Sequence, residues 1–261
     1  MNNTVTIATW NVNSLRVRLQ HVLKWLVTHQ PDVLALQETK VTDQDFPIAA
    51  LRDAGYEVCF SGQKSYNGVA ILSRFPIQQV ETSFPGFTDT QRRLLIATLG
   101  PLRVLNLYVP NGASLDSEKY EYKLAWLAQL QDYLAKELAT QRSVIVVGDF
   151  NIAPEDRDVY DPSRWAGHVL VSQPERQAFQ QLIDLGLVDT FRLFHPEANH
   201  YSWWDYRAAA FRRNHGLRID HILSTLHLSS RCIRCEIDKA PRSWEQPSDH
   251  VPVIATYENI N

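Results

Sequence analysis

One stretch, residues 143–151, most constrains how this chain can fold. The continuous apolar run Val144–Val147 is typical of a strand buried on both faces of a sheet. Directly after it come Gly148 and two polar residues, Asp149 and Asn151. Residues i and i+2 of a strand point to the same side, so we expect these two side chains to converge. An unpaired carboxylate beside a core is costly, so this strand end is either a functional site or a capped strand that leads into a turn.

Several other apolar segments also border conspicuous polar residues. Strands are expected at 5–11, 33–36, 102–108, 217–224 and 251–257. One polar residue at a strand end carries little information, because turns and caps use the same residue types. Six such ends in one chain indicate a shared crevice beside a sheet core, where ligands bind in layered α/β folds. The polar residues at these ends are Asn11, Gln37, Glu38, Tyr108, Asn111, Asp149, Asn151, Asp220, Asp249 and His250.

These residue types suit metal-assisted hydrolysis of a phosphodiester. Oxygen ligands such as the carboxylates of Glu38 and Asp249 and the amide of Asn11 fit a hard ion, Mg²⁺ or Mn²⁺. Such an ion would offset charge on the scissile phosphate and on the leaving oxygen. Each residue alone has an ordinary alternative, since a glutamate can pair with a nearby arginine and an Asp-His pair can cap a turn. The prediction of metal-assisted hydrolysis therefore depends on all of these residues together.

Further side chains have expected roles around the attacked phosphate. Asp149 would deprotonate or orient the attacking water, and Asn151 would fix its neighbour. His250 would bind the phosphate as imidazolium if Asp220 holds its other ring nitrogen. Tyr108 would donate to a phosphoryl oxygen or assist the leaving group, although a lone tyrosine at a strand end more often packs through its ring. The residues leave open whether Asp149 or His250 is the general base.

Helices are expected between these strands. Apolar residues recur at helical spacing after Ser14, which is placed to cap a helix, and again from Ser117 to Leu138. Ser172–Glu175 is typical of a capping box, and its helix is expected to stop at Gly186. A short helix is expected near 49–54, and other strand-like pieces lie at 56–61, 69–72, 94–99, 201–206 and 232–237. No linker, repeat or low-complexity tract divides the chain, so we expect residues 1–261 to form one α/β domain of stacked sheets with helices outside.

The composition indicates the class of protein and the compartment in which it works. Hydrophobic residues make up 44% of the chain and charged residues 21%, as in soluble globular proteins. No apolar run approaches the ~20 residues that span a bilayer, and the start of the chain lacks a signal-peptide pattern. Three cysteines are too few for a disulfide framework, and their number is odd. We therefore expect the protein to lie in the reducing cytoplasm. The C-x-x-C pair Cys232 and Cys235 lies in an expected strand without a second pair, which disfavours redox or zinc chemistry.

The distribution of charged residues indicates whether the chain can bind nucleic acid. A net charge of −3 argues weakly against nucleic acid, which usually favours a basic surface. A site rich in carboxylates lowers the net charge without removing a basic rim, so the distribution matters more than the sum. Local arginine clusters, each alone more often a solvated surface, are Arg16 with Arg18, Arg92 with Arg93, and Arg207, Arg212, Arg213 and Arg218.

At these residues the chain resembles the exonuclease III family of DNA-repair nucleases, within the larger endonuclease/exonuclease/phosphatase superfamily. The matching pieces run through nearly the whole chain in order and are highly specific together. They are Thr9–Arg16, Leu36–Lys40, Gly68–Ile71, Asn106–Gly112, Gly148–Pro154, Gly186–Arg192, Ser202–Arg207, Gly216–His221 and Pro247–Pro252. The resemblance implies a four-layer αββα sandwich of the DNase I-like kind, in which two packed mixed β-sheets are flanked by helices.

The resemblance also implies roles at the matching positions. Glu38 becomes the principal metal ligand, with Asn11 and Asp249 nearby. Asp149 activates water, Asn151 and Tyr108 surround the phosphate, Asn111 lies beside them, and His250 pairs with Asp220. Trp203 matches the aromatic residue that lines the pocket for a flipped-out abasic sugar, with Leu217 flanking it, although core packing is a serious alternative in a chain with seven tryptophans. Apart from the resemblance, Arg93 or Arg213 is a candidate phosphate contact, with an ordinary surface position as the alternative.

The implied activity is Mg²⁺- or Mn²⁺-dependent hydrolysis of DNA in base excision repair. The expected substrate is duplex DNA with 3′ ends, nicks or abasic sites, and the expected protein is a monomer. One stretch departs from the family. Many abasic-site enzymes carry small residues where this chain reads Trp165–Val169. If His168 lies at the pocket mouth, its imidazole occupies room that an internal abasic nucleotide needs, while a frayed 3′ end still enters. This favours 3′-end processing, as exonuclease and 3′-phosphatase or phosphodiesterase, with incision 5′ to internal abasic sites as the alternative.

Two rival assignments remain. Phosphoinositide phosphatases, sphingomyelinases and secreted DNases of the same superfamily share the metal and Asp-His core, but the pieces at 203–207 and 217–220 favour the DNA-repair branch. A binding module that has lost catalysis is the rival from another class. The intact set Glu38, Asp149, Asn151, Asp220 and His250 argues against it.

Overall fold

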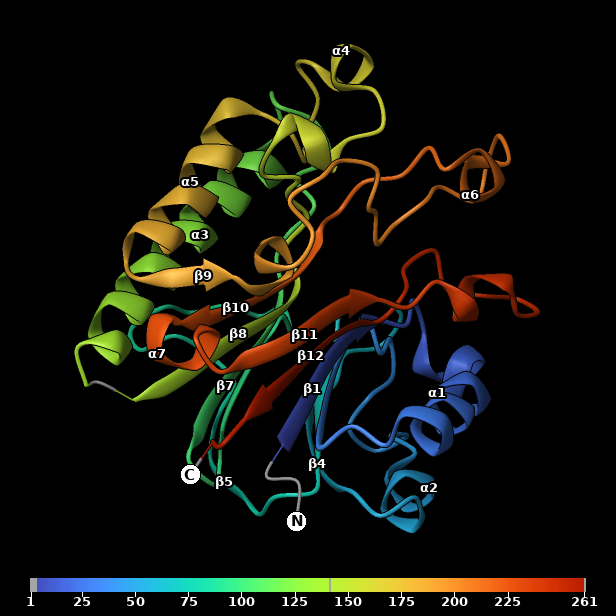
Figure 1. The fold of residues 1–261 in the computed structure, drawn as a ribbon, viewed down its shortest axis with the longest axis vertical. Coiled ribbons are helices and arrows are strands. Elements are labelled where there is room, and N and C mark those ends of the chain that lie inside the picture. The colour runs from blue at the N-terminus through green and yellow to red at the C-terminus, as the bar shows by residue number, and fades with distance from the viewer. Residues whose placement is uncertain (1–3, 141, 261) are drawn as a thin grey trace.

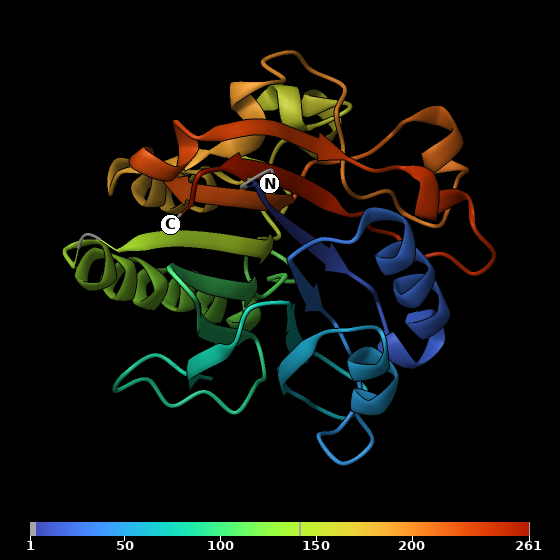
Figure 2. The same cartoon turned by 60° about the horizontal axis from the view of Figure 1, so that its bottom comes forward.

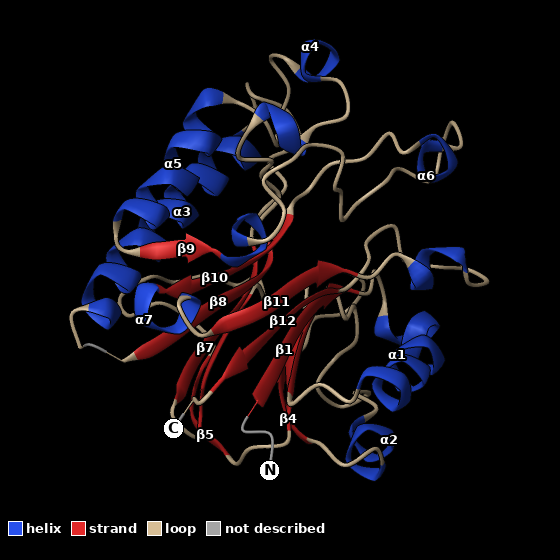
Figure 3. Ribbon diagram, viewed as in Figure 1, coloured by secondary structure: helices blue, strands red, loops and turns tan. Residues whose placement is uncertain are grey.

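A computed structural model describes residues 4–140 and 142–260 of the chain. Two six-stranded sheets pack face to face, and helices cover their outer faces (Figure 1; Figure 3). In the turned view α1 and α2 (blue) lie on one side of the paired sheets and α3 (green) on the other (Figure 2). The predicted four-layer αββα arrangement of two mixed sheets is confirmed.

The first sheet has the strand order β11-β12-β1-β2-β4-β3. Strands β1 and β2 are parallel, and the other neighbours in this sheet are antiparallel. Its strands are β1 (Thr4–Asn11), β2 (Val33–Gln37), β3 (Glu57–Ser61), β4 (Val69–Ser73), β11 (Cys232–Ile237) and β12 (Val253–Glu258). Helices α1 (Leu15–His29) and α2 (Ile48–Asp53) pack on its outer face.

The second sheet has the order β5-β6-β7-β8-β10-β9, with β7 and β8 parallel. Its strands are β5 (Ile77–Glu81), β6 (Leu94–Leu99), β7 (Leu102–Tyr108), β8 (Ser143–Asp149), β9 (Leu187–Asp189) and β10 (Asp220–Thr225). Helices α3 (Glu118–Leu138) and α5 (Gln173–Asp184) cover its outer face. Short helical turns complete the fold: η1 (Asp156–Asp158), α4 (Pro162–Trp165), η2 (Thr190–Leu193), α6 (Ala210–Arg213), α7 (Leu226–Ser229) and η3 (Ala240–Ser243).

Strand β8 is buried on both faces, as its sequence predicts. Ile145 and Val147 lie in the core between the two sheets, whereas Val144 and Val146 pack under α3. Each of these four side chains is fully buried. Burying a side chain of this size stabilises the fold by about 1.5–3 kcal/mol, so the run fixes β8 at the centre of its sheet.

Hydrogen bonds also join the two sheets through their interior. Gln37 at the end of β2 donates to Asn106 Oδ1 on β7 at 2.7 Å, and Asn106 Nδ2 donates to the carbonyls of Leu36 and Ala70. Both side chains are fully buried. Buried amides with satisfied hydrogen bonds favour one arrangement of the sheets over others. This bridge fixes the ends of β2 and β7 relative to each other.

Several local expectations are corrected. Residues 201–206 form only isolated bridges at Trp203, and not a strand. Strand β10 begins at Asp220 instead of at 217. Ser14 precedes α1 but makes no side-chain capping bond, whereas Ser117 caps α3 and the Ser172–Glu175 capping box of α5 is present. Strands β5 and β9 were not expected, since β5 is exposed and β9 has three residues.

Asp149 and Asn151 converge for a different reason from the predicted one. Strand β8 ends at Asp149, and Asn151 has a left-handed backbone with φ 50°. The Asn151 N–H then donates to Asp149 Oδ1 at 2.9 Å, as in an Asx turn. The Asp149 side chain therefore contacts the Asn151 backbone through a turn, and strand alternation does not join the two residues.

The structure also bears on the cysteines and on membrane-spanning helices. All three cysteines are free, and Cys235 is buried in β11. Burial raises the pKa of the Cys232 thiol to about 11, which makes a reactive thiolate unfavourable there. Within residues 4–140 and 142–260, no helix has the length and apolar character that a membrane crossing requires.

Candidate active site

The polar strand ends meet at one end of the sandwich. Parallel strands β1 and β2 end at Asn11 and Gln37, and parallel strands β7 and β8 end at Tyr108 and Asp149. Strand β10 runs antiparallel to β8 and begins there, so Asp220 is the register partner of Asp149. Ligand atoms of Glu38, Asp149 and His250 all lie within 4.8 Å of one another. The crevice expected at the strand ends is therefore formed.

Asn11 joins the acidic side chains of the two sheets. Its Nδ2 donates to Glu38 Oε1 at 2.9 Å and to Asp149 Oδ2 at 2.9 Å. Its Oδ1 accepts from the Asn13 backbone N–H at 3.0 Å. Glu38 also forms an ion pair with Lys40 at 2.8 Å and is about one-sixth exposed, with side-chain exposure of 17%. Two carboxylates held together beside an opening to solvent form an oxygen-rich site.

Asp249 lies in a separate set of contacts beside this centre. Its Oδ1 accepts from Asn13 Nδ2 and its Oδ2 from Trp203 Nε1, each at 3.0 Å. Burial opposes ionisation of Asp249, but the nearby His250 charge and these hydrogen bonds outweigh it and lower its pKa. The cluster of Glu38, Asp149 and His250 does not include Asp249, whereas Asn11 contacts Glu38 directly. The roles of Asn11 and Asp249 as metal ligands stay predictions.

His250 is held between two buried carboxylates. Its Nδ1 lies 2.9 Å from Asp220 Oδ2, and its Nε2 lies 3.7 Å from Asp149 Oδ2. Ser202 Oγ donates to Asp220 at 2.6 Å and accepts from the backbone N–H of Asp220, which orients the carboxylate. Burial disfavours the charged imidazole, but Asp220 and Asp149 outweigh burial and raise the pKa of His250 to about 10. The predicted Asp220–His250 pair is present.

Asp149, the second carboxylate beside His250, takes up a proton more readily than an ordinary aspartate. Burial raises its pKa to about 7, although the His250 charge acts against this shift. Asn151 Nδ2 donates to the Val109 carbonyl at 2.9 Å, and Asn111 Nδ2 donates to Asn151 Oδ1 at 3.2 Å. A carboxyl with a pKa near neutrality beside an imidazolium is suited to proton transfer.

Tyr108 lies at the end of β7, beside Asp149 at the end of β8. Burial and the carboxylates of Glu38 and Asp149 raise the pKa of its hydroxyl well above its ordinary value, so the hydroxyl keeps its proton. The Arg93 guanidinium lies 4.6 Å from the Tyr108 ring centroid and donates to the Tyr108 carbonyl at 3.2 Å. Arg93 therefore holds Tyr108 and places a positive charge near the site.

Three residues at or next to the carboxylate cluster have a left-handed backbone. Glu38 and Asn151 have left-handed backbones with φ near 50°, and Lys40 has φ 52°. A left-handed conformation of a non-glycine residue is held only where its surroundings fix it. The same conformation occurs at other described residues, such as Gln30 and Ala208, so at the site it describes the turns that place these side chains.

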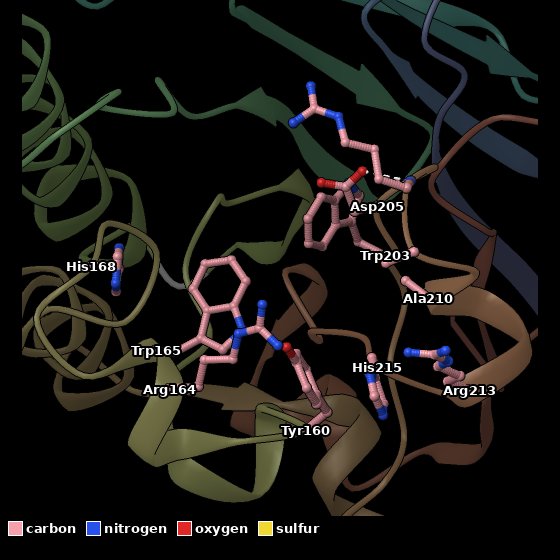
Figure 4. A pocket seen from close by; sticks show the side chains of 11 residues that line it. Tyr160, Arg164, Trp165, His168, Trp203, Asp205, Ala210, Arg213 and His215 are labelled. Atoms are coloured by element: carbon pink, nitrogen blue, oxygen red, sulfur yellow. Dashed lines mark hydrogen bonds between the residues drawn. The ribbon is translucent and has the colours of Figure 1, made fainter.

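A cavity of about 400 Å³ adjoins the site. Trp203 links the two, because its indole bonds Asp249 and its ring lines the cavity. Trp165 lies between His168 and Trp203, with ring centroids 6.2 Å and 6.4 Å away (Figure 4). His168 and Arg213 are exposed at its wall. Leu217, in contrast, is fully buried and pairs with Trp203 through backbone hydrogen bonds, so it supports the wall from behind.

Sequence reasoning missed several residues that build the site. Asn13 and Ser202 lie inside the quoted motifs but were given no role, although both hold acidic side chains. Lys123 on α3 is fully buried and donates to the Asn151 carbonyl at 2.7 Å. Its signal was available, because a lysine between Tyr120 and Leu127 at helical spacing occupies a core-facing position.

The donor set fits a hard divalent cation. Carboxylate oxygens of Glu38 and Asp149 face one opening together with an imidazole, all within 4.8 Å, and oxygen-rich sets of this kind favour Mg²⁺ or Mn²⁺ over softer metals. The two packed sheets and this carboxylate–histidine site together define a metal-dependent phosphoesterase of the αββα class.

Known proteins agree with this class. Residues 8–250 match the model of the Endonuclease/Exonuclease/phosphatase family. The chain is 39% identical to exodeoxyribonuclease III of Haemophilus influenzae, covering 95% of this chain and 98% of that protein. The chain belongs to the endonuclease/exonuclease/phosphatase family, and it is a phosphodiester-hydrolysing nuclease of the exonuclease III type.

Solved structures show the same fold. The 3′-5′ exonuclease NExo of Neisseria meningitidis superposes with a TM-score of 0.96 at 46% identity, covering 98% of this chain and 100% of that chain. A structure of the Neisseria 3′ phosphatase NExo bound to a product DNA hairpin matches equally well. An AP endonuclease from Archaeoglobus fulgidus matches with a TM-score of 0.95 at 42% identity, covering 98% of this chain and 100% of that chain.

Proposed function

We propose that this nuclease hydrolyses 3′ ends of duplex DNA in base excision repair, using Mg²⁺ or Mn²⁺. The observation that carries the proposal is the convergence of Glu38, Asp149 and His250 beside a cavity walled by aromatic and arginine side chains. The relatives named 3′-5′ exonuclease, 3′ phosphatase and exodeoxyribonuclease III support it. The matching AP endonuclease supports the second candidate, incision 5′ to internal abasic sites.

The proposed roles follow from the electrostatics of each group. His250 is an imidazolium at neutral pH and donates to a phosphate oxygen, because Asp220 and Asp149 hold its charge. An imidazolium cannot accept a proton, so Asp149 is the general base for the attacking water. Tyr108 keeps its proton and donates to the phosphate. Asn151 and Asn111 fix the geometry around Asp149.

Glu38 would hold the metal ion, and Asn11 joins its carboxylate to that of Asp149, which stays free of the ion to act as the base. When bound, the ion supplies positive charge against the scissile phosphate and the leaving oxygen. Asp249 orients Trp203 and Asn13 at the edge of this centre. Arg93, beside Tyr108, and Arg213, on the cavity wall, add positive charge for contact with the DNA backbone.

His168 is the proposed determinant of substrate preference. It is exposed on the cavity wall beside Trp165, where a side chain restricts the space open to an extrahelical nucleotide. A frayed 3′ terminus needs less of that space. Replacing His168 by Gly is expected to raise incision of an internal abasic analogue and leave 3′ processing unchanged. The matched control is His227→Gly on α7, another exposed histidine. Equal incision by wild type and His168→Gly removes the proposal.

One time course ranks the activities. A labelled duplex carries an internal abasic analogue, a recessed 3′ hydroxyl and a 3′ phosphate, and the products are followed with and without EDTA. We expect 3′-end products first and none with EDTA. The Glu38→Gln variant should need at least ~10-fold more Mg²⁺ for half-maximal rate, as is typical when a metal site is disrupted. Binding of the duplex without any cleavage at saturating Mg²⁺ would identify a binding module instead.

We further propose that residues 1–261 act as one domain, as a monomer and in the cytoplasm. The site draws side chains from both sheets, so neither sheet forms it alone. The three free cysteines suit a reducing compartment. Sedimentation of the purified protein with and without duplex DNA tests the monomer.

A further inference from the structure

A second group of metal-ligand side chains lies away from the active site, in the segment after η2. His195, Glu197 and His200 each offer a ligand atom within 4.8 Å of the other two. Glu197 Oε1 lies 2.7 Å from His200 Nε2 and 3.5 Å from His195 Nδ1. We propose that these three side chains form a binding site for a divalent transition metal, with Zn²⁺ as the best-suited ion.

The distances fit the geometry of that ion. Zn²⁺ binds imidazole nitrogen and carboxylate oxygen at about 2.0–2.2 Å, so two ligands of a tetrahedral site lie about 3.3 Å apart. The distances of 2.7 Å and 3.5 Å from Glu197 Oε1 to the two imidazoles lie on either side of that value. Small rotations of the exposed Glu197 side chain are enough to equalise them. Two imidazoles with one carboxylate also suit Zn²⁺ better than Mg²⁺, which favours oxygen.

The tautomer of His195 is fixed in the state that a metal needs. Its Nε2 lies 2.9 Å from the Cys235 carbonyl on β11. A carbonyl only accepts, so Nε2 carries the hydrogen and Nδ1 presents a lone pair toward the Glu197 carboxylate in the neutral ring. These two acceptors lie 3.5 Å apart, so either a proton on Nδ1 or a bound metal ion offsets their repulsion, and the ion is the occupant that we propose. Metal-binding histidines commonly donate their other ring nitrogen to a carbonyl in this way.

The surrounding structure also holds the ligands in place. The His195 ring stacks on Phe191 with centroids 4.5 Å apart, and the His200 ring meets Phe191 edge-on at 5.5 Å. Arg192 Nη1 donates to the carbonyls of His195 and Glu197, at 2.7 Å each, which fixes the loop between the ligands. The charge of Arg192 is countered by the fully buried Asp158, so it opposes a bound cation less. The loop is therefore preorganised before any ion binds.

The site is open on one side. His195 and His200 line a cavity of about 540 Å³ that also contacts β11 and β12. Their side chains are about one-third exposed, at 29% and 32%. Arg234 on the same wall is paired with Glu236 at 2.6 Å, so it does not repel a cation unopposed. Three protein ligands and an open side leave the fourth position to water, as in other three-ligand zinc sites.

The test is a Zn²⁺ titration of the whole protein in excess Mg²⁺, which occupies the catalytic centre. Calorimetry gives the number of Zn²⁺ bound, and NMR of ¹⁵N-histidine follows the ring nitrogens. We expect the His195 Nδ1 and His200 Nε2 resonances to shift together with one equivalent. His195→Asn with His200→Asn should bind one equivalent fewer. Glu197→Gln, which keeps the shape, should weaken this binding on the order of 10–100-fold.

His227→Asn is the matched control, because His227 is exposed on α7 and its side chain bonds only Ser143 among the hydrogen bonds of the described residues. It should bind Zn²⁺ as wild type does. Unchanged Mg²⁺-dependent nuclease rates in all variants would show that they fold. The proposal is overturned if wild type and the double histidine variant bind the same number of Zn²⁺ ions. It is also overturned if the two histidines respond to pH alone, which would indicate an imidazolium in place of a metal.

Discussion

Asp149 and Asp220 are register partners on the antiparallel strands β8 and β10, so their carboxylates leave the sheet on the same face. Two buried like charges at this spacing repel each other. His250 resolves the conflict, because its ring lies 2.9 Å from Asp220 and 3.7 Å from Asp149. The pairing register of the sheet thus sets the protonation of the catalytic residues.

This relationship predicts the behaviour of His250 when one carboxylate is removed. Asp220→Asn should lower the pKa of His250 from about 10 toward its ordinary value, because the nearest negative charge is lost. The pKa is measured by ¹⁵N-histidine NMR in the absence of metal. Asp184→Asn on α5, an exposed carboxylate, is the control and should change nothing. An unchanged His250 titration in Asp220→Asn would show that the pair does not hold the charge.

Removing one member of the buried Lys123–Glu175 pair should strongly destabilise the fold. Lys123 joins α3 to the Asn151 and Asn111 carbonyls, and Glu175 also accepts from the backbone of Leu170 and Ser172. Lys123→Met leaves the Glu175 charge buried without its partner, so we expect a loss of about 3–5 kcal/mol in the free energy of unfolding.

Adding Glu175→Gln to Lys123→Met tests the cause of that loss. The neutral amide keeps one acceptor oxygen, for either the Leu170 or the Ser172 N–H, and carries no uncompensated charge, so the double variant should regain part of the stability. Urea unfolding measures both variants. A double variant less stable than Lys123→Met would contradict this reason.

The ion network around Arg218 predicts a loss of stability in acid. Burial and the nearby Arg218 charge lower the pKa of His221 from 6.5 to about 4. The unfolded chain therefore binds a proton that the folded chain excludes, so stability falls as the pH drops from about 6.5 to about 4. Below this range Asp158 acts in the same direction, because its pKa of about 2 lies below its ordinary 3.8.

The measurement compares His221→Gln with wild type by urea unfolding across this pH range. The variant cannot take up the proton, so its stability should fall by up to about 3 kcal/mol less than that of wild type. Taking the difference cancels contributions from other groups. Parallel curves for the two proteins would rule out His221 as the source.

Gly148 should tolerate no side chain. It has φ 140°, and a Cβ at this position would lie 2.0 Å from the Leu107 carbonyl oxygen on the neighbouring strand. Gly148→Ala must separate β7 from β8, so we expect a loss of about 3 kcal/mol or more. Gly186→Ala is the control, because it also has a positive φ but open space around it, and it should cost only about 1 kcal/mol. Thermal unfolding compares the two, and equal losses would exclude the clash as the cause.

Some features of the fold and site follow from local sequence and others do not. The burial of β8, the capping box of α5 and the residue types of the crevice are visible in the chain, because each depends on neighbours a few residues away. The roles of Asn13 and Ser202 are not visible, since each contacts a partner far along the chain. The helical spacing places Lys123 on the buried face but does not identify its distant partner Asn151. Leu217 was expected at the cavity and is buried behind Trp203, because a backbone bridge between distant segments decides which side chain faces outward.

The sequence by itself determined the layered α/β class, the family and the set of acidic, amide and histidine side chains that cluster at the strand ends. Only the tertiary structure decided which of these side chains meet. It places Asp149 and His250 beside Glu38, whereas Asp249 accepts hydrogen bonds from Trp203 and Asn13. It also assembled the distant His195, Glu197 and His200 site against the Cys235 carbonyl. The physical reason is that strand register and sheet packing fix distances between residues that local patterns leave unrelated.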